Sequence, residues 1–191
     1  KGPEVSQASW YYSRPNLKTN GLITIDKKIY SIQGLSWLDH EWSSEFLHPD
    51  AVGWDWVGIN LIDGGSLMAF RIRKNDGSTI WSDFSMLDAN GKKHPWSEQK
   101  NISDTTVTAK WSILKEWLSP NSFAKYPISQ KITIGQKALI FVPLIENQEL
   151  DARMTTGGFY WEGAVKLIIN EQIFGKGFLE LTGYSSPIKL K

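Results

Sequence analysis

Three titratable residues follow one another in the segment Gly34–Trp42, which reads Gly-Leu-Ser-Trp-Leu-Asp-His-Glu-Trp. Asp39, His40 and Glu41 are of the types that most often donate or accept protons in catalysis. They lie among tryptophans, and burying a charged group costs free energy unless it is paired, so the segment indicates a partner or a function. Taken alone, it is explained equally well by a structural, hydrogen-bonded histidine beside tryptophan residues.

The same segment is predicted to be a β-strand. Its apolar positions lack helical spacing, and its tryptophans suit a pleated, half-buried surface. Because side chains alternate between the two faces of a strand, Asp39 and Glu41 should point to one face and His40 and Trp42 to the other.

Two later strands each carry a carboxylate among apolar residues, Glu162 and Glu180. These two could face each other across an antiparallel pair. Two carboxyl groups held close would have their pKa values pushed apart and would form an acid/base pair, whereas a nearby arginine, Arg71 or Arg153, would make them ordinary ion pairs. We favour the ion pair for Glu180 and leave the role of Glu162 open. The glycines that flank them indicate bulges or close strand packing.

The sequence around these residues reads as many short strands separated by turns. Residues 1–15 are interpreted as an extended lead-in, 107–117 as a strand or a short helix, and 148–154 as the one candidate helix. The sequence predicts an antiparallel meander, which a chain of this length closes as a β-barrel because closure removes exposed edges. The predicted strands are 21–25, 28–32, 53–62, 66–73, 78–87, 130–134, 138–144, 159–169 and 175–184.

The composition narrows the possible functions. A chain of 191 residues that is 41% hydrophobic can bury one sizeable core, and ten tryptophans suit a β-protein with an apolar interior or a ligand cavity. A net charge of +1 without a basic stripe argues against nucleic-acid binding. The absence of cysteine excludes disulfides, thiolate metal sites and a cysteine nucleophile. No segment approaches the ~20 apolar residues of a transmembrane helix.

Four motifs, spread in order over nearly all of the chain, carry a family resemblance. The chain resembles the AttH-type predicted secreted hydrolases and carotenoid 1,2-hydratases (hydroxyneurosporene synthases). The resemblance implies a lipocalin-like β-barrel, usually present as two units in tandem. It also implies that residues 1–48 correspond to the end of the N-terminal unit and 49–191 to the C-terminal barrel. The motifs are Gly34–Trp42, Gly53–Trp56, Tyr160–Ala164 and Gly177–Tyr184.

The resemblance also implies a site at the seam between the two units. The three histidines are not at metal-ligand spacing, so no metal is expected there, and no cofactor is expected either. Hydration of an isolated alkene needs an acid that protonates carbon, then attack of water on the cation, with aromatic faces stabilising the charge. A further acid is expected near 67–73, which carries none. The chain lacks the Gly-x-Ser-x-Gly motif of many hydrolases. The candidate catalytic residues are Asp39, His40 and Glu41, and the candidate ligand-binding residues are Trp42, Trp54, Trp56, Tyr160 and Glu162.

Two functions of different class follow. The first, which the pocket composition favours, is a periplasmic or secreted binding protein of the bacterial cell envelope that holds a lipid, isoprenoid or similar apolar ligand in the barrel. Its candidate partners are the missing N-terminal barrel and a transport-system component. The second is a cofactor-independent hydratase or lyase that acts on an isoprenoid-like alkene through the Asp-His-Glu-Trp motif. A third possibility, a structural half that only packs against its missing partner, would expose a large apolar surface.

Overall fold

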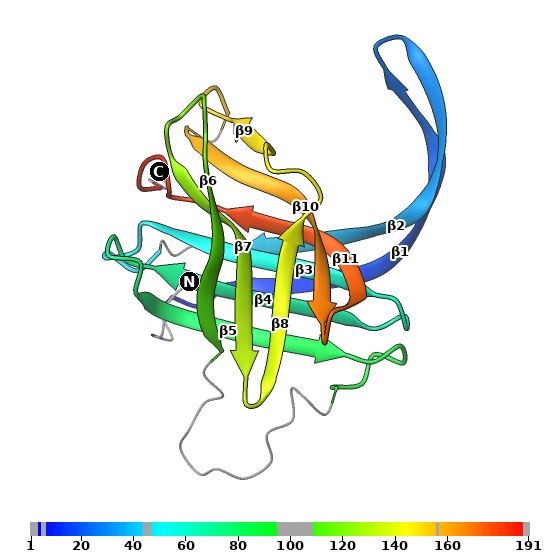
Figure 1. The fold of residues 1–191 in the computed structure, drawn as a ribbon, viewed down its shortest axis with the longest axis horizontal. Coiled ribbons are helices and arrows are strands. Elements are labelled where there is room, and N and C mark those ends of the chain that lie inside the picture. Colours follow the sequence, from blue (N-terminus) through cyan, green and yellow to red (C-terminus); the bar gives the residue numbers. More distant parts are fainter. Residues whose placement is uncertain (1–3, 5–6, 44–46, 95–108, 156, 189–191) are drawn as a thin grey trace.

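The computed structural model describes residues 4, 7–43, 47–94, 109–155 and 157–188. The elements in this part of the chain are all β-strands (Figure 1), which confirms the predicted all-β class. The strands are β1 (Trp10–Ile25), β2 (Lys28–Trp42), β3 (Gly53–Leu61), β4 (Ser66–Arg73), β5 (Thr79–Leu87), β6 (Lys110–Leu118), β7 (Lys125–Ile134), β8 (Lys137–Pro143), β9 (Glu149–Asp151), β10 (Phe159–Ile169) and β11 (Gln172–Leu181).

Strands β1 and β2 form a long hairpin that curves away from the other strands towards its tip (Figure 1). The tip turns at Asp26 and Lys27, whose φ angles of 48° and 65° are those of a two-residue hairpin turn. The turn was predicted at these residues. The lead-in was not correctly predicted, because its aromatic end is the first part of β1 and pairs with the titratable segment, Trp10 opposite Trp42.

The hairpin is fastened to the main sheet where β1 is interrupted. A register shift follows Arg14, and Asn16 there has a φ of 55°. The backbone N–H of Asn16 donates to Asn60 Oδ1 at 2.9 Å, and its side-chain amide donates to the carbonyls of Gly64 and Gly65 at 2.9 and 3.0 Å. Asn16 therefore connects the hairpin to the end of β3 and to the turn that follows it.

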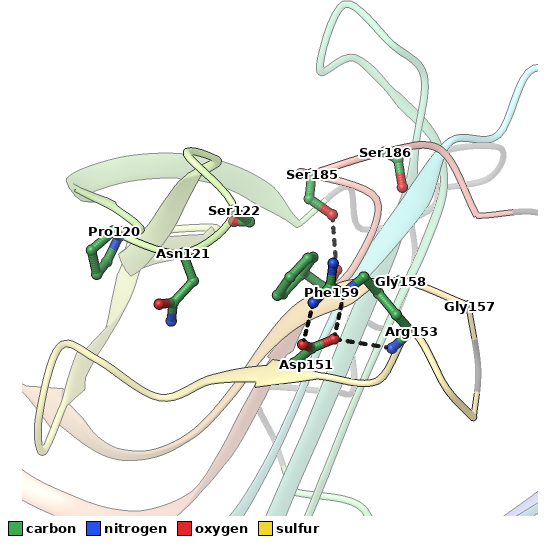
Figure 2. A pocket seen from close by; sticks show the side chains of 10 residues that line it. All are labelled: Pro120, Asn121, Ser122, Asp151, Arg153, Gly157, Gly158, Phe159, Ser185 and Ser186. Atoms are coloured by element: carbon green, nitrogen blue, oxygen red, sulfur yellow. Dashed lines mark hydrogen bonds and ion pairs between the residues drawn. The ribbon is translucent and has the colours of Figure 1, made fainter.

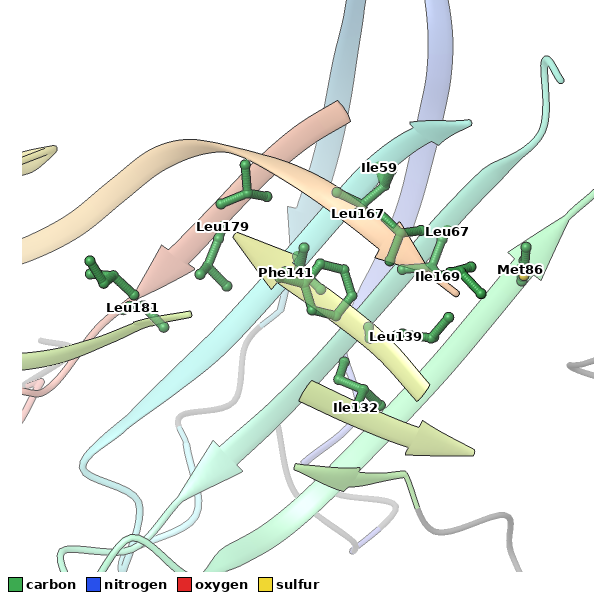
Figure 3. Packing of buried hydrophobic residues seen from close by; sticks show 14 of the residues in the cluster. Ile59, Leu67, Met86, Ile132, Leu139, Phe141, Leu167, Ile169, Leu179 and Leu181 are labelled. Atoms are coloured by element: carbon green, nitrogen blue, oxygen red, sulfur yellow. The ribbon is translucent and has the colours of Figure 1, made fainter. Parts of the chain in front are cut away.

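The other nine strands form one antiparallel sheet with the order β5-β4-β3-β11-β10-β8-β7-β6, and β9 pairs with β10. The sheet curls so that β6 to β8 lie across β3 to β5 (Figure 1), which is the predicted lipocalin-like architecture. Aliphatic and aromatic side chains fill the space between these layers (Figure 3). The fully buried residues of this hydrophobic core include Ile59, Leu67, Phe141, Leu167 and Leu179.

Two local predictions need correction or completion. The candidate helix at 148–154 is wrong, because Glu149–Asp151 forms β9 and pairs with β10. The backbone carbonyl of Gln148 accepts from Glu162 N at 3.1 Å, so this segment satisfies its polar groups through the sheet. The ambiguous segment 107–117 is strand β6 from Lys110 onward, and residues 107–108 lie outside the described part.

The glycines near Glu180 mark close strand packing, as predicted. A Cβ atom on Gly177 would overlap the carbonyl oxygen of Gly58 on the neighbouring strand β3. Gly177→Ala should therefore force the two strands apart and lower the free energy of unfolding by roughly 1–3 kcal/mol. Urea denaturation would measure this change. Gly21→Ala is the matched control, because its Cβ meets nothing within 4 Å; equal losses in the two variants would contradict the steric explanation.

Candidate functional site

A cavity of about 1310 Å³ lies between the β1–β2 hairpin and the face of the main sheet that points away from the core. Alternation along β3 explains this position. Asp55, Val57 and Ile59 are fully buried on the core side, so Trp54 and Trp56 face the cavity. The expectation of a ligand inside the barrel is therefore wrong, because packed side chains fill that interior.

The cavity has aromatic walls on both sides. Trp37 of the hairpin meets Trp56 of the sheet edge to face, with ring centroids 5.9 Å apart, and Trp56 Nε1 donates to the hydroxyl of Tyr11 at 3.1 Å. Gly58 makes room for this contact, because a Cβ there would collide with the Trp56 ring and lie 3.0 Å from the Trp37 ring. Other large apolar residues in the lining are Trp54, Met68, Phe70, Ile72, Trp81 and Phe178.

Six carboxyl groups also line this cavity, together with one lysine, Lys176, among the described residues. The hairpin holds one of them firmly, since Asp39 Oδ1 accepts from Trp37 Nε1 and from Ser13 Oγ, each at 2.6 Å. Burial raises the pKa of the nearby Tyr11 hydroxyl well above its ordinary value, so Tyr11 stays protonated. The six carboxyl residues are Glu4, Asp39, Glu41, Asp83, Glu162 and Glu180.

Glu162 and Glu180 stand directly opposite each other on β10 and β11, as the sequence suggested. The pKa of Glu180 is raised to about 7, chiefly by burial and to a smaller extent by the nearby carboxylates, while a hydrogen bond with the Trp54 side chain lowers it. Burial also raises the pKa of Glu162. A carboxyl group that keeps its proton near neutral pH is what general-acid catalysis requires.

The ion pair predicted for Glu180 is not formed in the described part of the chain. Its two candidate partners are engaged elsewhere, since Arg71 bonds to Asp55 at 2.7 Å and Arg153 to Asp151 at 2.8 Å. Glu180 is therefore held in an aromatic and acidic environment, where the pKa shift follows from desolvation instead of being cancelled by a cation.

The predicted alternation of the titratable segment is confirmed, and it divides the segment between two faces. Asp39 and Glu41 line the cavity. His40 and Trp42 lie on the opposite face of β2, and their ring centroids are 5.0 Å apart. His40 Nδ1 is 3.3 Å from the Tyr12 hydroxyl.

Five of the eight predicted site residues thus meet at one cavity, and three do not. Tyr160, like His40 and Trp42, lines neither cavity described here; it stands opposite Leu150 in the β9–β10 pair. The residues that meet are Asp39, Glu41, Trp54, Trp56 and Glu162. Trp37, Asp83 and Glu180 also line the cavity, although they were not among the predicted site residues. Asp83 stands opposite Phe70 on β4, so it is a carboxyl group next to residues 67–73.

A buried ionic cluster lies directly behind the two cavity tryptophans of β3. Asp55 has no exposed surface, and it bonds to Arg71 Nη2 at 2.7 Å and to Arg73 Nε at 2.8 Å. The Tyr184 hydroxyl donates to it at 2.9 Å, and Gln130 Nε2 is 3.3 Å away. The cluster joins β3, β4, β7 and the C-terminal segment, so it fixes the strand that carries Trp54 and Trp56.

A second cavity, of about 860 Å³, opens beside β9 and the C-terminal segment (Figure 2). Its charged side chains are Asp151 and Arg153, which neutralise each other, and Arg153 also lies over the Phe159 ring at 4.6 Å. Ser185 Oγ donates to the Phe159 carbonyl at 3.1 Å. The charges of this cavity are paired with each other, whereas the cavity of about 1310 Å³ holds carboxyl groups among indole rings.

Comparison with known proteins identifies the family. A family model described as AttH-like matches residues 1–184. The chain belongs to the AttH-like family. This confirms the resemblance that the four motifs carried. A search of the curated proteins finds no match.

Two solved structures share the fold of this AttH-like chain. The crystal structure of an AttH from Nitrosomonas europaea is 40% identical with a TM-score of 0.85, and the match covers 96% of this chain and 55% of that one. Kievitone hydratase from Nectria haematococca is 16% identical with a TM-score of 0.67, covering 93% and 53%. The chain thus spans about half the length of these proteins. In the described part, no helix is long and apolar enough to cross a membrane.

Proposed function

We propose that this AttH-like chain is a cofactor-independent hydratase that adds water across an isolated carbon–carbon double bond of an apolar, isoprenoid-like substrate. One observation carries the proposal: Glu180, a carboxyl group with a pKa of about 7, lies at a large cavity walled by tryptophans. The fold shared with a kievitone hydratase supports it. The domain assignment, 1–48 and 49–191, and the location in the periplasm or outside the cell remain predictions.

The reaction follows from the groups at the cavity. The O–H bond of Glu180 breaks as the π electrons of the alkene form a new C–H bond, which leaves a tertiary carbocation and a carboxylate. The indole faces of Trp54 and Trp56 stabilise the cation. Water then attacks it to form the C–O bond, and the excess proton of the bound water returns to a carboxylate of the Glu162–Glu180 pair. The enzyme regains its starting protonation state, and no oxidant or reductant is consumed.

A binding protein that carries an apolar ligand without converting it is the second candidate. The observation that favours it is the cavity itself, whose volume of about 1310 Å³ and aromatic lining suit a ligand of drug or terpene size. In that case the carboxyl groups would orient the ligand, and a component of a transport system would be the expected partner.

Incubation with an acyclic isoprenoid alkene in ¹⁸O-labelled water separates the two candidates. A hydratase should give a tertiary alcohol that carries one heavy oxygen. Its rate should fall as the pH rises through about 7, because Glu180 must be protonated to act as the acid. Mass spectrometry of the extracted product measures both. Saturable quenching of tryptophan fluorescence without incorporation of oxygen would establish the carrier instead. If neither quenching nor incorporation were observed, both candidates would be refuted.

A further inference from the structure

The charge of the main cavity limits which ligands can enter it. Five of its six carboxyl groups come from β2, β5, β10 and β11, and the sixth, Glu4, precedes β1. They surround the space from several sides, against the single cation of Lys176 in the described lining. Even when the Glu162–Glu180 pair holds a proton, the acidic groups outnumber that lysine. The potential inside the cavity is therefore negative.

The two arginines of β4, which forms part of the cavity wall, do not offset this charge. Arg71 and Arg73 project from β4 to the other face of the sheet, where both are buried against Asp55. Arg71 also lies over the Trp111 ring, and Arg73 over the Tyr184 ring. Both guanidinium groups are thus paired on the core side, and the described lining contains no arginine that could bind an anionic ligand.

The aromatic walls of the cavity also favour a cationic ligand, as the carboxyl groups do. Four indole rings line the cavity, those of Trp37, Trp54, Trp56 and Trp81. The face of an indole ring attracts a cation through its quadrupole, and aromatic walls of this kind are how proteins recognise quaternary ammonium groups. A carboxylate ligand placed at the same walls would lose its hydration and meet like charges.

From this combination we infer that the cavity selects organic cations, in which a positive charge is carried by an apolar skeleton, over anions that have the same skeleton. The inference rests on the proposed function in using the same cavity, and it names the class of ligand that the cavity accepts. A neutral alkene is admitted and becomes the preferred species when it is protonated. A permanent ammonium ion of similar shape is a stable ligand. Free fatty acids and isoprenoid diphosphates are rejected.

A series with one hydrocarbon skeleton tests this selection. Geranyltrimethylammonium, geraniol and geranic acid differ in the charge at one end, and isothermal titration at pH 8 measures the affinity of each for the whole chain. We expect the ammonium compound to bind at least about tenfold more tightly than the acid, with the alcohol between them. Added salt should reduce the difference. Equal or tighter binding of geranic acid, or no binding of the ammonium compound, would overturn the inference.

Two variants locate the preference in this cavity. Glu180→Gln and Asp83→Asn each remove one negative charge from a different strand. Each should weaken binding of the ammonium compound about three- to tenfold and binding of the neutral geraniol less. Glu116→Gln is the matched control, since Glu116 is exposed on β6 and lies outside the lining. If neither cavity variant lost affinity for the ammonium compound, the compound would bind elsewhere on the protein.

The outcome is separable from that of the proposed function. Cation preference without incorporation of labelled oxygen would refute the hydratase and leave the selection intact. Hydration of the neutral alkene without cation preference would do the opposite.

Discussion

Glu180→Gln should reduce the rate of alkene hydration by on the order of 10²–10⁴-fold, the usual contribution of a positioned general acid. Glutamine keeps the shape of the side chain and its place opposite Glu162, but it has no proton acidic enough to transfer to carbon. Binding of a neutral alkene should change little, so the loss should appear in kcat and not in KM. A variant that retained most of its kcat would remove Glu180 from the mechanism.

The same substitution should stabilise the protein at alkaline pH. Glu180 has a pKa of about 7 in the folded chain against an ordinary value of 4.5, so the folded state binds its proton more tightly than the unfolded state does. Its contribution to stability is fully present below about pH 4.5 and is lost as the pH rises through 7. Above that pH the ionised group lowers the stability by about 3.5 kcal/mol, at 1.4 kcal/mol per pKa unit. Glutamine does not ionise and avoids this cost.

Urea denaturation at pH 5 and pH 8.5 measures this gain. The variant should match the original chain at pH 5 within about 1 kcal/mol and exceed it at pH 8.5. Glu116→Gln, which changes an exposed carboxylate on β6, should show no such divergence. Loss of stability at both pH values would show that Glu180 has a structural role and would remove the basis for an acid with a raised pKa.

Asp55→Asn should lower the free energy of unfolding by about 3–5 kcal/mol, because it leaves the guanidinium groups of Arg71 and Arg73 buried without a counter-charge. Asparagine is nearly the same size as aspartate, so loss of charge and not of volume is the cause. The expected loss is a large fraction of the total stability of a small domain. Thermal and urea denaturation would both show it.

A surface pair provides the control for this prediction. Asp151 and Arg153 also form an ion pair at 2.8 Å, but on the surface, where water screens their attraction. Asp151→Asn should therefore leave the unfolding midpoint nearly unchanged. If the two aspartate variants lost the same stability, burial would not be what gives the Asp55 cluster its strength. Because Asp55 lies between Trp54 and Trp56, ligand affinity should also fall in Asp55→Asn.

Turn residues and the alternation of side chains predicted the strands correctly where the pairing partners are close in sequence or the alternation is regular. They placed the hairpin turn at Asp26 and Lys27, and they separated Asp39 from His40. They failed at β9 and at the first residues of β1, because those segments become strands only by pairing with strands that lie about ten or more residues away. No local pattern records such a partner.

The position of the site was harder to predict than its residues. Alternation shows that Trp54 and Trp56 share one face of β3 and Asp55 the other, but not which face is buried in the core. By residue type, the aspartate should face water and the tryptophans the core. The structure has the reverse order, because Arg71 and Arg73 neutralise Asp55 inside the barrel. That outcome depends on β4, and no inspection of β3 alone reveals it.

The hydrogen bonds that Asn16 makes between the hairpin and the main sheet should affect how fast a ligand leaves the cavity. One wall of the cavity belongs to the hairpin and the other to the main sheet, and Asn16 joins them through hydrogen bonds to Asn60, Gly64 and Gly65. Separating the walls there requires those bonds to break, although none of the three lies on a catalytic group. The residence time of a bulky ligand is thus coupled to an asparagine in a strand interruption, and substitutions at Asn16 should change dissociation rates more than equilibrium selectivity.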